Sequence, residues 1–195
     1  MNLSKMGRYV SLLGCALALG MAAGCASSSK PSQPVGPASP EWVMKGSGAF
    51  KDSNGISVIY GVGASQGVKL VPLARQNADA AADAEITKVV NNYVSTLVKS
   101  YMASTTAGDL SKSSDEQHVS STLKTFGQAC LHGVQKIDHW KDPSDGTLYT
   151  LAKLDMSAIK KTLEEQKELD SKVRDFVRAN AEKAFDELAA EEAKH

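Results

Sequence analysis

The residue with the clearest chemistry in this sequence is Cys25, which follows the small residues Ala22-Ala23-Gly24. Two early cations, Lys5 and Arg8, and a short apolar run precede these small residues. A positive start, an apolar run and a small-residue cleavage site define a secretory signal. A cysteine thiol placed first after the cut is the group that becomes acylated in bacterial lipoproteins. We therefore predict a signal peptide over residues 1–24 and lipidation of Cys25, which would anchor the chain to a membrane.

Two other interpretations of this segment stay open. Leu12-Leu13-Gly14-Cys15 fits the lipoprotein cleavage pattern better locally, because leucine usually stands where Ala22 precedes Cys25, but a cut there would leave almost no apolar run. An ordinary secretory signal with a chance cysteine is the second alternative. The apolar run is shorter than the roughly 20 residues of a membrane-spanning helix. Ala26, in place of an aspartate, favours sorting to the outer membrane, on its periplasmic or cell-surface face.

Three further residues could bind a metal or act as a nucleophile pair, namely Cys130, His132 and His139. Their spacing is not that of the usual zinc motifs, and no fourth ligand is evident. A cysteine–histidine nucleophile would also need an orienting acid, which the sequence does not place. We expect Cys130 to be a buried apolar side chain, and we predict no catalytic residue, no metal site and no cofactor.

A glycine-rich stretch from Gly61 to Gly67 follows a predicted strand and precedes a predicted helix, which is the setting of a dinucleotide-binding loop. The third glycine comes one place late for that motif, and no second parallel strand follows. We instead expect Gly61 and Gly63 to lie on one face of the strand, where they leave room for another backbone.

The charge balance excludes one class of partner. The whole chain carries 22 Lys+Arg and 22 Asp+Glu. Lys5 and Arg8 are the only charged residues before Cys25, so a chain cut there would keep 20 basic and 22 acidic residues. A net charge of −2 offers no basic surplus for nucleic acid phosphates. The paired acids of the last forty residues are expected to form the solvated face of a helix.

The elements that must position these residues follow a Ser/Pro-rich tether over residues 25–40. Such a composition stays extended and buries little. Alternating apolar residues predict a strand over residues 56–65, with a shorter partner at residues 47–50. Residues 134–140 and 147–155 predict a β-hairpin, because Asp142 to Gly146 supply turn residues between them.

Helices are predicted over residues 73–102 and 115–129, and from residue 156 to the C-terminus. The first begins with alanines and continues with larger residues, which indicates close approach to the sheet at one end and a deeper core at the other. We predict one hydrophobic cluster, whose members are Tyr93, Leu97, Trp140, Tyr149 and Leu151. The fold class expected is α+β, with a small antiparallel sheet packed against a long helix and a long C-terminal helical tail.

The tail has an apolar stripe that is too long for a small domain to cover: Leu169, Val173, Phe176, Val177, Ala184 and Leu188. Exposed apolar surface of that shape usually marks a partner site. We therefore divide the chain into an α+β domain over residues 41–163 and a charged amphipathic tail over residues 164–195. The tail is expected to dock a partner helix or to self-associate. The alternative is that it folds back on residues 86–101 and belongs to the core.

A family resemblance rests on residues around Trp140-Lys141-Asp142-Pro143, Gly146-Thr147, Tyr149-Thr150-Leu151 and Leu154-Asp155. With Pro40-Glu41-Trp42-Val43 and Tyr60-Gly61-Val62-Gly63-Ala64, in this order behind a lipoprotein signal, they resemble the Lpp-twenty-like family of outer-membrane lipoproteins of about twenty kilodaltons. The N-terminal domain of the flagellar assembly protein T is more distantly similar.

The resemblance implies a compact α+β domain in the cell envelope with no known enzymatic activity. Two function classes follow. The first is a non-catalytic, lipid-anchored envelope protein that binds another protein or peptidoglycan. The second is an accessory factor of one envelope machine, in flagellar assembly or in activation of a wall synthase. An enzyme is not expected.

Overall fold

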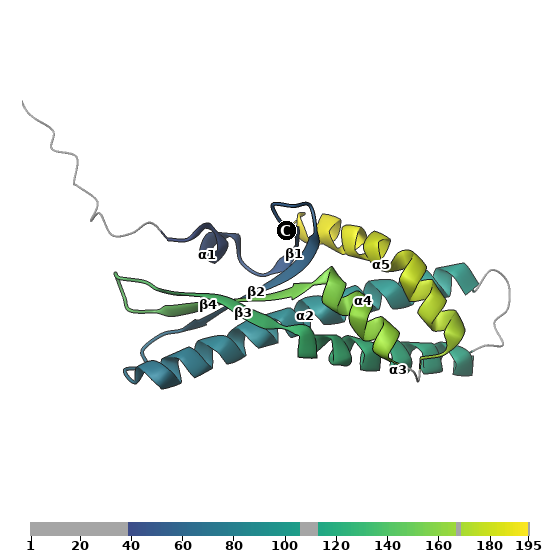
Figure 1. The fold of residues 1–195 in the computed structure, drawn as a ribbon, viewed down its shortest axis with the longest axis horizontal. Helices are drawn as coiled ribbons and strands as arrows, with labels where there is room; N and C mark the ends of the chain where they lie inside the picture. The colour runs from purple at the N-terminus through teal and green to yellow at the C-terminus, as the bar shows by residue number, and fades with distance from the viewer. Residues whose placement is uncertain (1–38, 106–112, 167–168, 195) are drawn as a thin grey trace, which may run out of the picture. The chain divides into compact units, whose positions relative to one another are not determined.

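A computed structural model of the protein describes residues 39–105, 113–166 and 169–194 (Figure 1). The predicted α+β fold is confirmed, because these residues form one four-stranded antiparallel sheet in the order β1-β2-β4-β3 with helices packed on it. The strands are β1 (Gly48–Lys51), β2 (Ser57–Ser65), β3 (Gln135–Lys141) and β4 (Leu148–Asp155). The helices are α1 (Glu41–Lys45), α2 (Val71–Thr105), α3 (Ser113–Cys130), the 3₁₀ turn η1 (Leu131–Gly133), α4 (Met156–Glu165) and α5 (Ser171–Glu192).

The first half of α2 packs directly on the sheet, where β2 has glycines. A Cβ atom on Gly61 would lie 2.4 Å from the carbonyl oxygen of Ala82, and one on Gly63 would lie 2.2 Å from the carbonyl oxygen of Ala78. Ala78 and Ala82 are completely buried at this contact. The expectation that the two glycines leave room for another backbone is confirmed, and the glycine-rich stretch is a packing feature of the strand.

The second half of α2 lies beyond the glycine contact and forms a helical core with α3, α4 and α5 (Figure 1). Its large side chains Tyr93 and Leu97 are at most 1% exposed. The change from small to large residues along α2 therefore separates sheet packing from helix packing, as the sequence predicted. No helix within the described residues is long and apolar enough to cross a membrane.

The C-terminal segment differs from the prediction in two respects. It is not one helix, because α4 ends at Glu165 and α5 begins at Ser171, where the Asp170 side chain accepts a hydrogen bond from the Lys172 N–H at 2.8 Å. An aspartate at this capping position favours a new helix start. The side chain of Arg174 donates to the Gln166 and Leu169 carbonyls and thereby ties the break together.

The apolar stripe of α5 is also not exposed. Its residues are buried in the core shared with α2, and only Phe176 is half-buried, with its ring edge-on to that of Tyr101 at 5.0 Å. The expectation of an uncovered apolar surface was wrong, because the break after α4 lets the chain turn back over α2. The alternative of a tail that folds back into the core is the one observed. The buried members are Leu169, Val173, Val177, Ala184 and Leu188.

The two edges of the sheet are protected from strand pairing in different ways. At β1, the end of α5 approaches the edge, and the Glu192 carboxylate accepts a hydrogen bond from the Ala49 N–H at 2.7 Å. At β3, the pairing with β4 shifts register between Lys136 and Asp138, which leaves Ile137 in a bulge and 47% exposed. A bulge and nearby charges are common ways to disfavour strand pairing at an open edge.

Candidate functional site

The face of the sheet that points away from α2 carries a strip of partly exposed aromatic side chains. We call it the open-face strip, and its members are Trp42, Phe50, Tyr60, Trp140 and Tyr149. The rings of Trp140 and Tyr149 pair across β3 and β4 with centroids 5.6 Å apart, and those of Phe50 and Tyr60 pair across β1 and β2 at 5.9 Å. Tilted rings at these spacings are favourable aromatic pairs.

This arrangement corrects the predicted core. Tyr93 and Leu97 belong to the main cluster, whereas Trp140, Tyr149 and Leu151 do not. Side chains alternate between the faces of a strand. Thr150, on β4, bonds to α2, so its neighbours Tyr149 and Leu151 point to the other face. The prediction was wrong because the alternation of residues in the hairpin predicts two faces but does not indicate which face packs against α2.

The short helix α1 lies over part of the open face and creates a hollow of about 280 Å³. The indole N–H of Trp42 donates to the Asp138 carboxylate at 3.0 Å, which fixes α1 to β3. The Lys45 ammonium lies 4.3 Å from the centre of the Phe50 ring, a cation–π contact. The walls of the hollow are Glu41, Trp42, Lys45, Gly46, Tyr60 and Leu151.

The open-face strip combines flat apolar rings with one acid and one base at its margin. Tyrosine and tryptophan supply large contact area together with a polar group, which is why they are enriched in protein-binding surfaces. The hollow's lining contains no cysteine, serine or histidine. The arrangement is suited to binding a ligand by stacking and hydrogen bonding.

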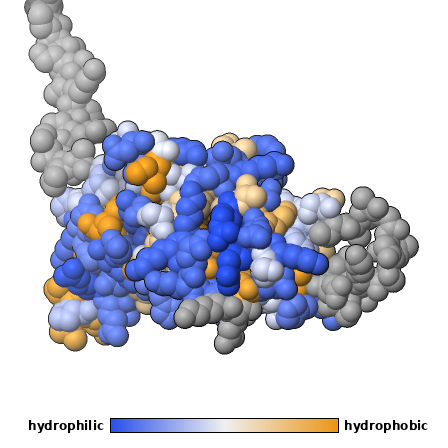
Figure 2. Space-filling model, turned by 45° about the vertical axis from the view of Figure 1, so that its right-hand side comes forward, coloured by the Kyte–Doolittle hydropathy of each residue, from blue (hydrophilic) through white to orange (hydrophobic). Residues whose placement is uncertain are grey.

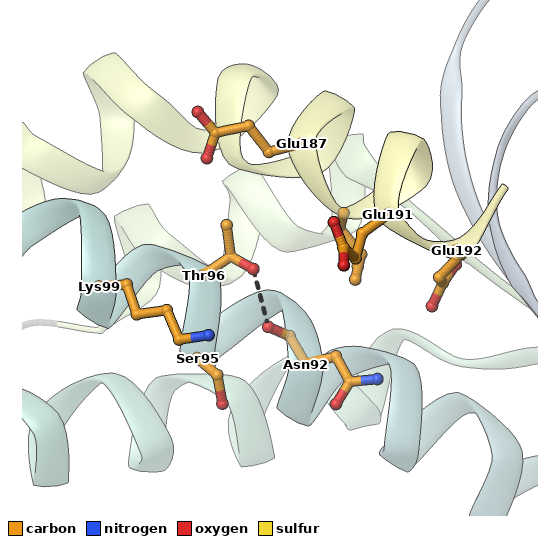
Figure 3. A pocket seen from close by; sticks show the side chains of 8 residues that line it. Asn92, Ser95, Thr96, Lys99, Glu187, Glu191 and Glu192 are labelled. Carbon is orange, nitrogen blue, oxygen red and sulfur yellow. Dashed lines mark hydrogen bonds between the residues drawn. The ribbon is translucent and has the colours of Figure 1, made fainter. Parts of the chain in front are cut away.

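A second hollow, of about 440 Å³, lies between α2 and α5 (Figure 3). Carboxylates from Glu187, Glu191 and Glu192 line it on α5, and Lys99 is the base on α2. Glu192 is already engaged by the Ala49 N–H at the edge of β1. No cluster of three histidine, cysteine or acidic residues able to hold a metal occurs within the part of the chain that the structure describes. This hollow is a shallow polar groove between two packed helices.

His139 is held in a polar link between α2 and the hairpin. Its Nε2 lies 2.7 Å from Asp79 Oδ1, and the Thr150 hydroxyl donates to the same oxygen at 2.8 Å. The guanidinium of Arg75 lies 3.3 Å from Nδ1 of His139. A guanidinium only donates, so Nδ1 accepts and Nε2 carries the proton that Asp79 accepts. Both ring nitrogens are therefore occupied, and the imidazole acts as a cross-link.

The electrostatics of this link favour the charged carboxylate. Partial burial raises the pKa of Asp79, but the hydrogen bonds from His139 and Thr150 and the nearby Arg75 charge lower it further. The pKa of Asp79 consequently lies below its ordinary value. No sequence pattern gave Asp79 or Arg75 a role, and Thr150 stood only among the residues that carry the family resemblance. The available signal was the pair of polar residues at positions 75 and 79, one helical turn apart, among the sheet-facing alanines of α2.

The other chemically interesting residues lie apart. Cys130 is in the core, as expected, and burial raises the pKa of its thiol to about 12, so it is a poor nucleophile. His132 is at the surface, where its ring lies 3.1 Å from the Ala129 carbonyl. The structure thus separates Cys130, His132 and His139 into the core, the surface and the α2 link. Cys25, the predicted lipidation site, lies outside the described residues, as do the tether up to residue 38 and the signal segment.

The acids of the last helices lie on the outer face and are paired with cations. Glu164 binds Arg178 at 2.9 Å, and Glu182 binds Lys160 at 2.6 Å. These pairs are exposed by about half, so they contribute little stability each. They join α4 to α5 across the helix break.

No protein-family model matches the chain, and no similar sequence is found among curated proteins. The resemblance to Lpp-twenty-like lipoproteins therefore depends on the residues quoted in the sequence analysis.

Proposed function

We propose that this chain is a non-catalytic, lipid-anchored protein of the outer membrane that acts by binding another envelope protein. The observation that carries the proposal is the open-face strip. Three of its members, Trp42, Phe50 and Tyr60, lie near the start of the described chain, after the Ser/Pro-rich tether that would connect the domain to Cys25. A binding surface on a tethered domain needs no catalytic residues of its own, and a tether lets it reach a partner away from the lipid.

Three features support a binding role over an enzymatic one. The imidazole of His139 has both nitrogens in hydrogen-bond contacts within the protein. The thiol of Cys130 is buried, with its pKa raised. The α2–α5 groove is lined by paired helices and contains neither histidine nor cysteine. The aromatic strip, by contrast, presents the residue types that dominate binding energy in protein interfaces.

The proposal is tested by photo-crosslinking in the native cell envelope. A photoreactive amino acid is placed at Tyr149 in the open-face strip or, as a matched control, at Glu187 in the α2–α5 groove. We expect a discrete crosslinked protein from position 149 and none from position 187. The variant Trp140→Ala should reduce the yield of crosslinked protein from position 149, because it removes the ring that pairs with residue 149.

Other outcomes distinguish the alternatives. Crosslinks from position 187 alone would overturn the assignment of the open face. Co-sedimentation with purified peptidoglycan that depends on Trp140, without a protein crosslink, would identify the cell wall as the ligand. A crosslinked flagellar component or wall synthase would identify the protein as an accessory factor of that machine.

A further inference from the structure

The end of the molecule where α2 begins presents apolar side chains to solvent. Leu70 is 64% exposed, Val71 66% and Leu73 43%, and we call these three residues the apolar tip. They are adjacent in sequence and stand at the N-terminal end of a long, well-packed helix. In Figure 2 an apolar area marks this lower left end within a mostly hydrophilic face. Apolar side chains gathered at one end of a molecule commonly mark an interaction site.

Cations surround the apolar tip. Lys69, Arg75 and Lys141 are exposed there, and Lys69 and Lys141 share a hollow of about 320 Å³ with Val71. Lys69 and Lys141 form no ion pair within the described residues, whereas Arg75 contacts His139 and lies close enough to Asp79 to lower the pKa of its carboxyl. The tip therefore combines apolar side chains with two lysines, Lys69 and Lys141, that form no ion pair among the described residues.

Two acids also lie in the neighbouring hairpin turn, and both are engaged by the turn itself. The Asp142 carboxylate accepts from the Ser144 N–H at 2.7 Å, and the Asp145 carboxylate accepts from the Thr147 N–H at 2.8 Å. Asp145 also accepts from the Gln66 side chain at 3.0 Å. These hydrogen bonds engage both carboxylates within the turn, and Asp145 also lines the hollow that contains Lys69 and Lys141.

The position of the tip matters as well. Along the longest axis of the molecule, the first described residues, before α1, lie toward the same end as the start of α2 (Figure 1). The β1–β2 turn and the C-terminal end of α5 lie farther along this axis. A domain that an extended tether holds near a membrane could turn this end toward the lipid.

We propose that the apolar tip is a contact site for an anionic lipid bilayer. Leucine and valine side chains would enter the boundary between headgroups and acyl chains, and Lys69 and Lys141 would contact lipid phosphates. Apolar residues flanked by Lys and Arg are the pattern of interfacial membrane contacts, and cations near an anionic surface add attraction that salt screens. The contact belongs to the folded domain and is separate from acylation at Cys25.

The test measures the distance of the tip from lipid in the full-length protein. A fluorescent amino acid is placed at Gln76, which is exposed one turn after Leu73, or at Ser53 in the β1–β2 turn. The protein is combined with vesicles whose phosphatidylglycerol and phosphatidylcholine carry brominated, quenching acyl chains. We expect strong quenching at position 76 and weak quenching at position 53, and a smaller difference with phosphatidylcholine alone or in high salt.

Variants then identify the groups responsible. Leu70→Ser with Val71→Ser should remove the quenching at position 76. Ile56→Ser with Ile137→Ser, which deletes two comparably apolar and exposed side chains elsewhere, should leave it unchanged. Lys69→Gln should weaken the contact about fivefold, as expected for one cation at an anionic surface. Thermal unfolding monitored by circular dichroism should be unchanged in all three, because the altered side chains are exposed.

Equal quenching at the two positions, or none at position 76 in anionic vesicles, would overturn the proposal. The same holds if the tip variant and its control behave alike. If the tip variant instead abolishes a protein crosslink and leaves quenching unaffected, the surface binds a protein and the lipid assignment is wrong. These readouts report the position of the tip, so they do not depend on which partner binds the open-face strip.

Discussion

The hydroxyl of Tyr93 donates a hydrogen bond to the main-chain carbonyl of Ala181, 3.2 Å away, inside the core between α2 and α5. Both residues are at most 3% exposed. A buried tyrosine hydroxyl needs a partner, since an unpaired polar group in an apolar core is costly. In this protein the partner is supplied by the last helix, which makes α5 part of the fold.

Truncation after Gln166 tests this role of α5. We expect the shortened protein to lose its cooperative unfolding transition in circular dichroism, because the truncation uncovers the core side chains of α2 and leaves the Tyr93 hydroxyl without its partner. Truncation after Glu192, which removes only the last three residues, is the matched control and should melt like the full chain. A cooperative unfolding transition in the shorter protein, with the same change in circular dichroism as in the full chain, would contradict the observed packing.

The glycine contact beneath α2 can be tested with Gly63→Ala. The added methyl would lie 2.2 Å from main-chain atoms of Ala78 and Ala82, so the helix must move away from the sheet. We expect a loss of roughly 1–3 kcal/mol or more in the free energy of unfolding measured with urea. Ala64→Ser, at the next position and on the exposed opposite face, should change this free energy by less than about 0.5 kcal/mol. Similar effects from both substitutions would contradict the close approach.

The Asp79 link predicts a dependence of stability on pH. The pKa of Asp79 is lower in the folded chain than in the unfolded chain, so its charged form stabilises the fold above the unfolded value. That contribution should disappear as the pH falls from about 4 through the folded-state pKa. Asp79→Asn should therefore flatten the fall of the unfolding free energy in this range, and Thr150→Val, which removes one of the hydrogen bonds, should flatten it less. If the unfolding free energy of Asp79→Asn fell with decreasing pH as steeply as that of the unchanged protein, the prediction would be wrong.

Anchoring through Cys25 remains a prediction from the sequence. Cys25→Ser should move the protein from the membrane fraction to the soluble fraction, or leave the signal segment uncleaved, since the thiol that would be acylated is absent. Cys15→Ser is the matched control and should leave fractionation unchanged. A correctly cleaved Cys25→Ser chain without acyl groups, still found wholly with membranes, would show that another part of the molecule holds it there.

Much of the fold could be predicted because local pattern and local chemistry agree. The period-two pattern of β2 and the Asp142 to Gly146 turn specify strands and a hairpin without tertiary information. The alanine-rich start of α2 and the glycines of β2 are complementary in size, so their contact could be inferred as well. The free thiol of Cys130 was correctly expected to be buried.

The remaining features depend on contacts between distant segments. Which face of the hairpin meets α2 is decided by Thr150, whose hydroxyl finds Asp79 seventy-one positions earlier in the chain. The break before Ser171 has a capping aspartate, but an unbroken pattern of helix-forming residues obscured it. Helix α1 was missed because five residues are too few for a periodic signal.

The hydrogen bond from the Ala49 N–H to Glu192 has a consequence for assembly. With the end of α5 at the β1 edge, strand addition to this sheet is left to the β3 side, where the bulge at Ile137 already disfavours it. A sheet that can grow from one side alone can join one neighbour. Association through strands would therefore stop at a pair and could not propagate into a fibre. If the chain is held on a membrane as proposed, crowding there would raise the population of pairs without leading to polymers.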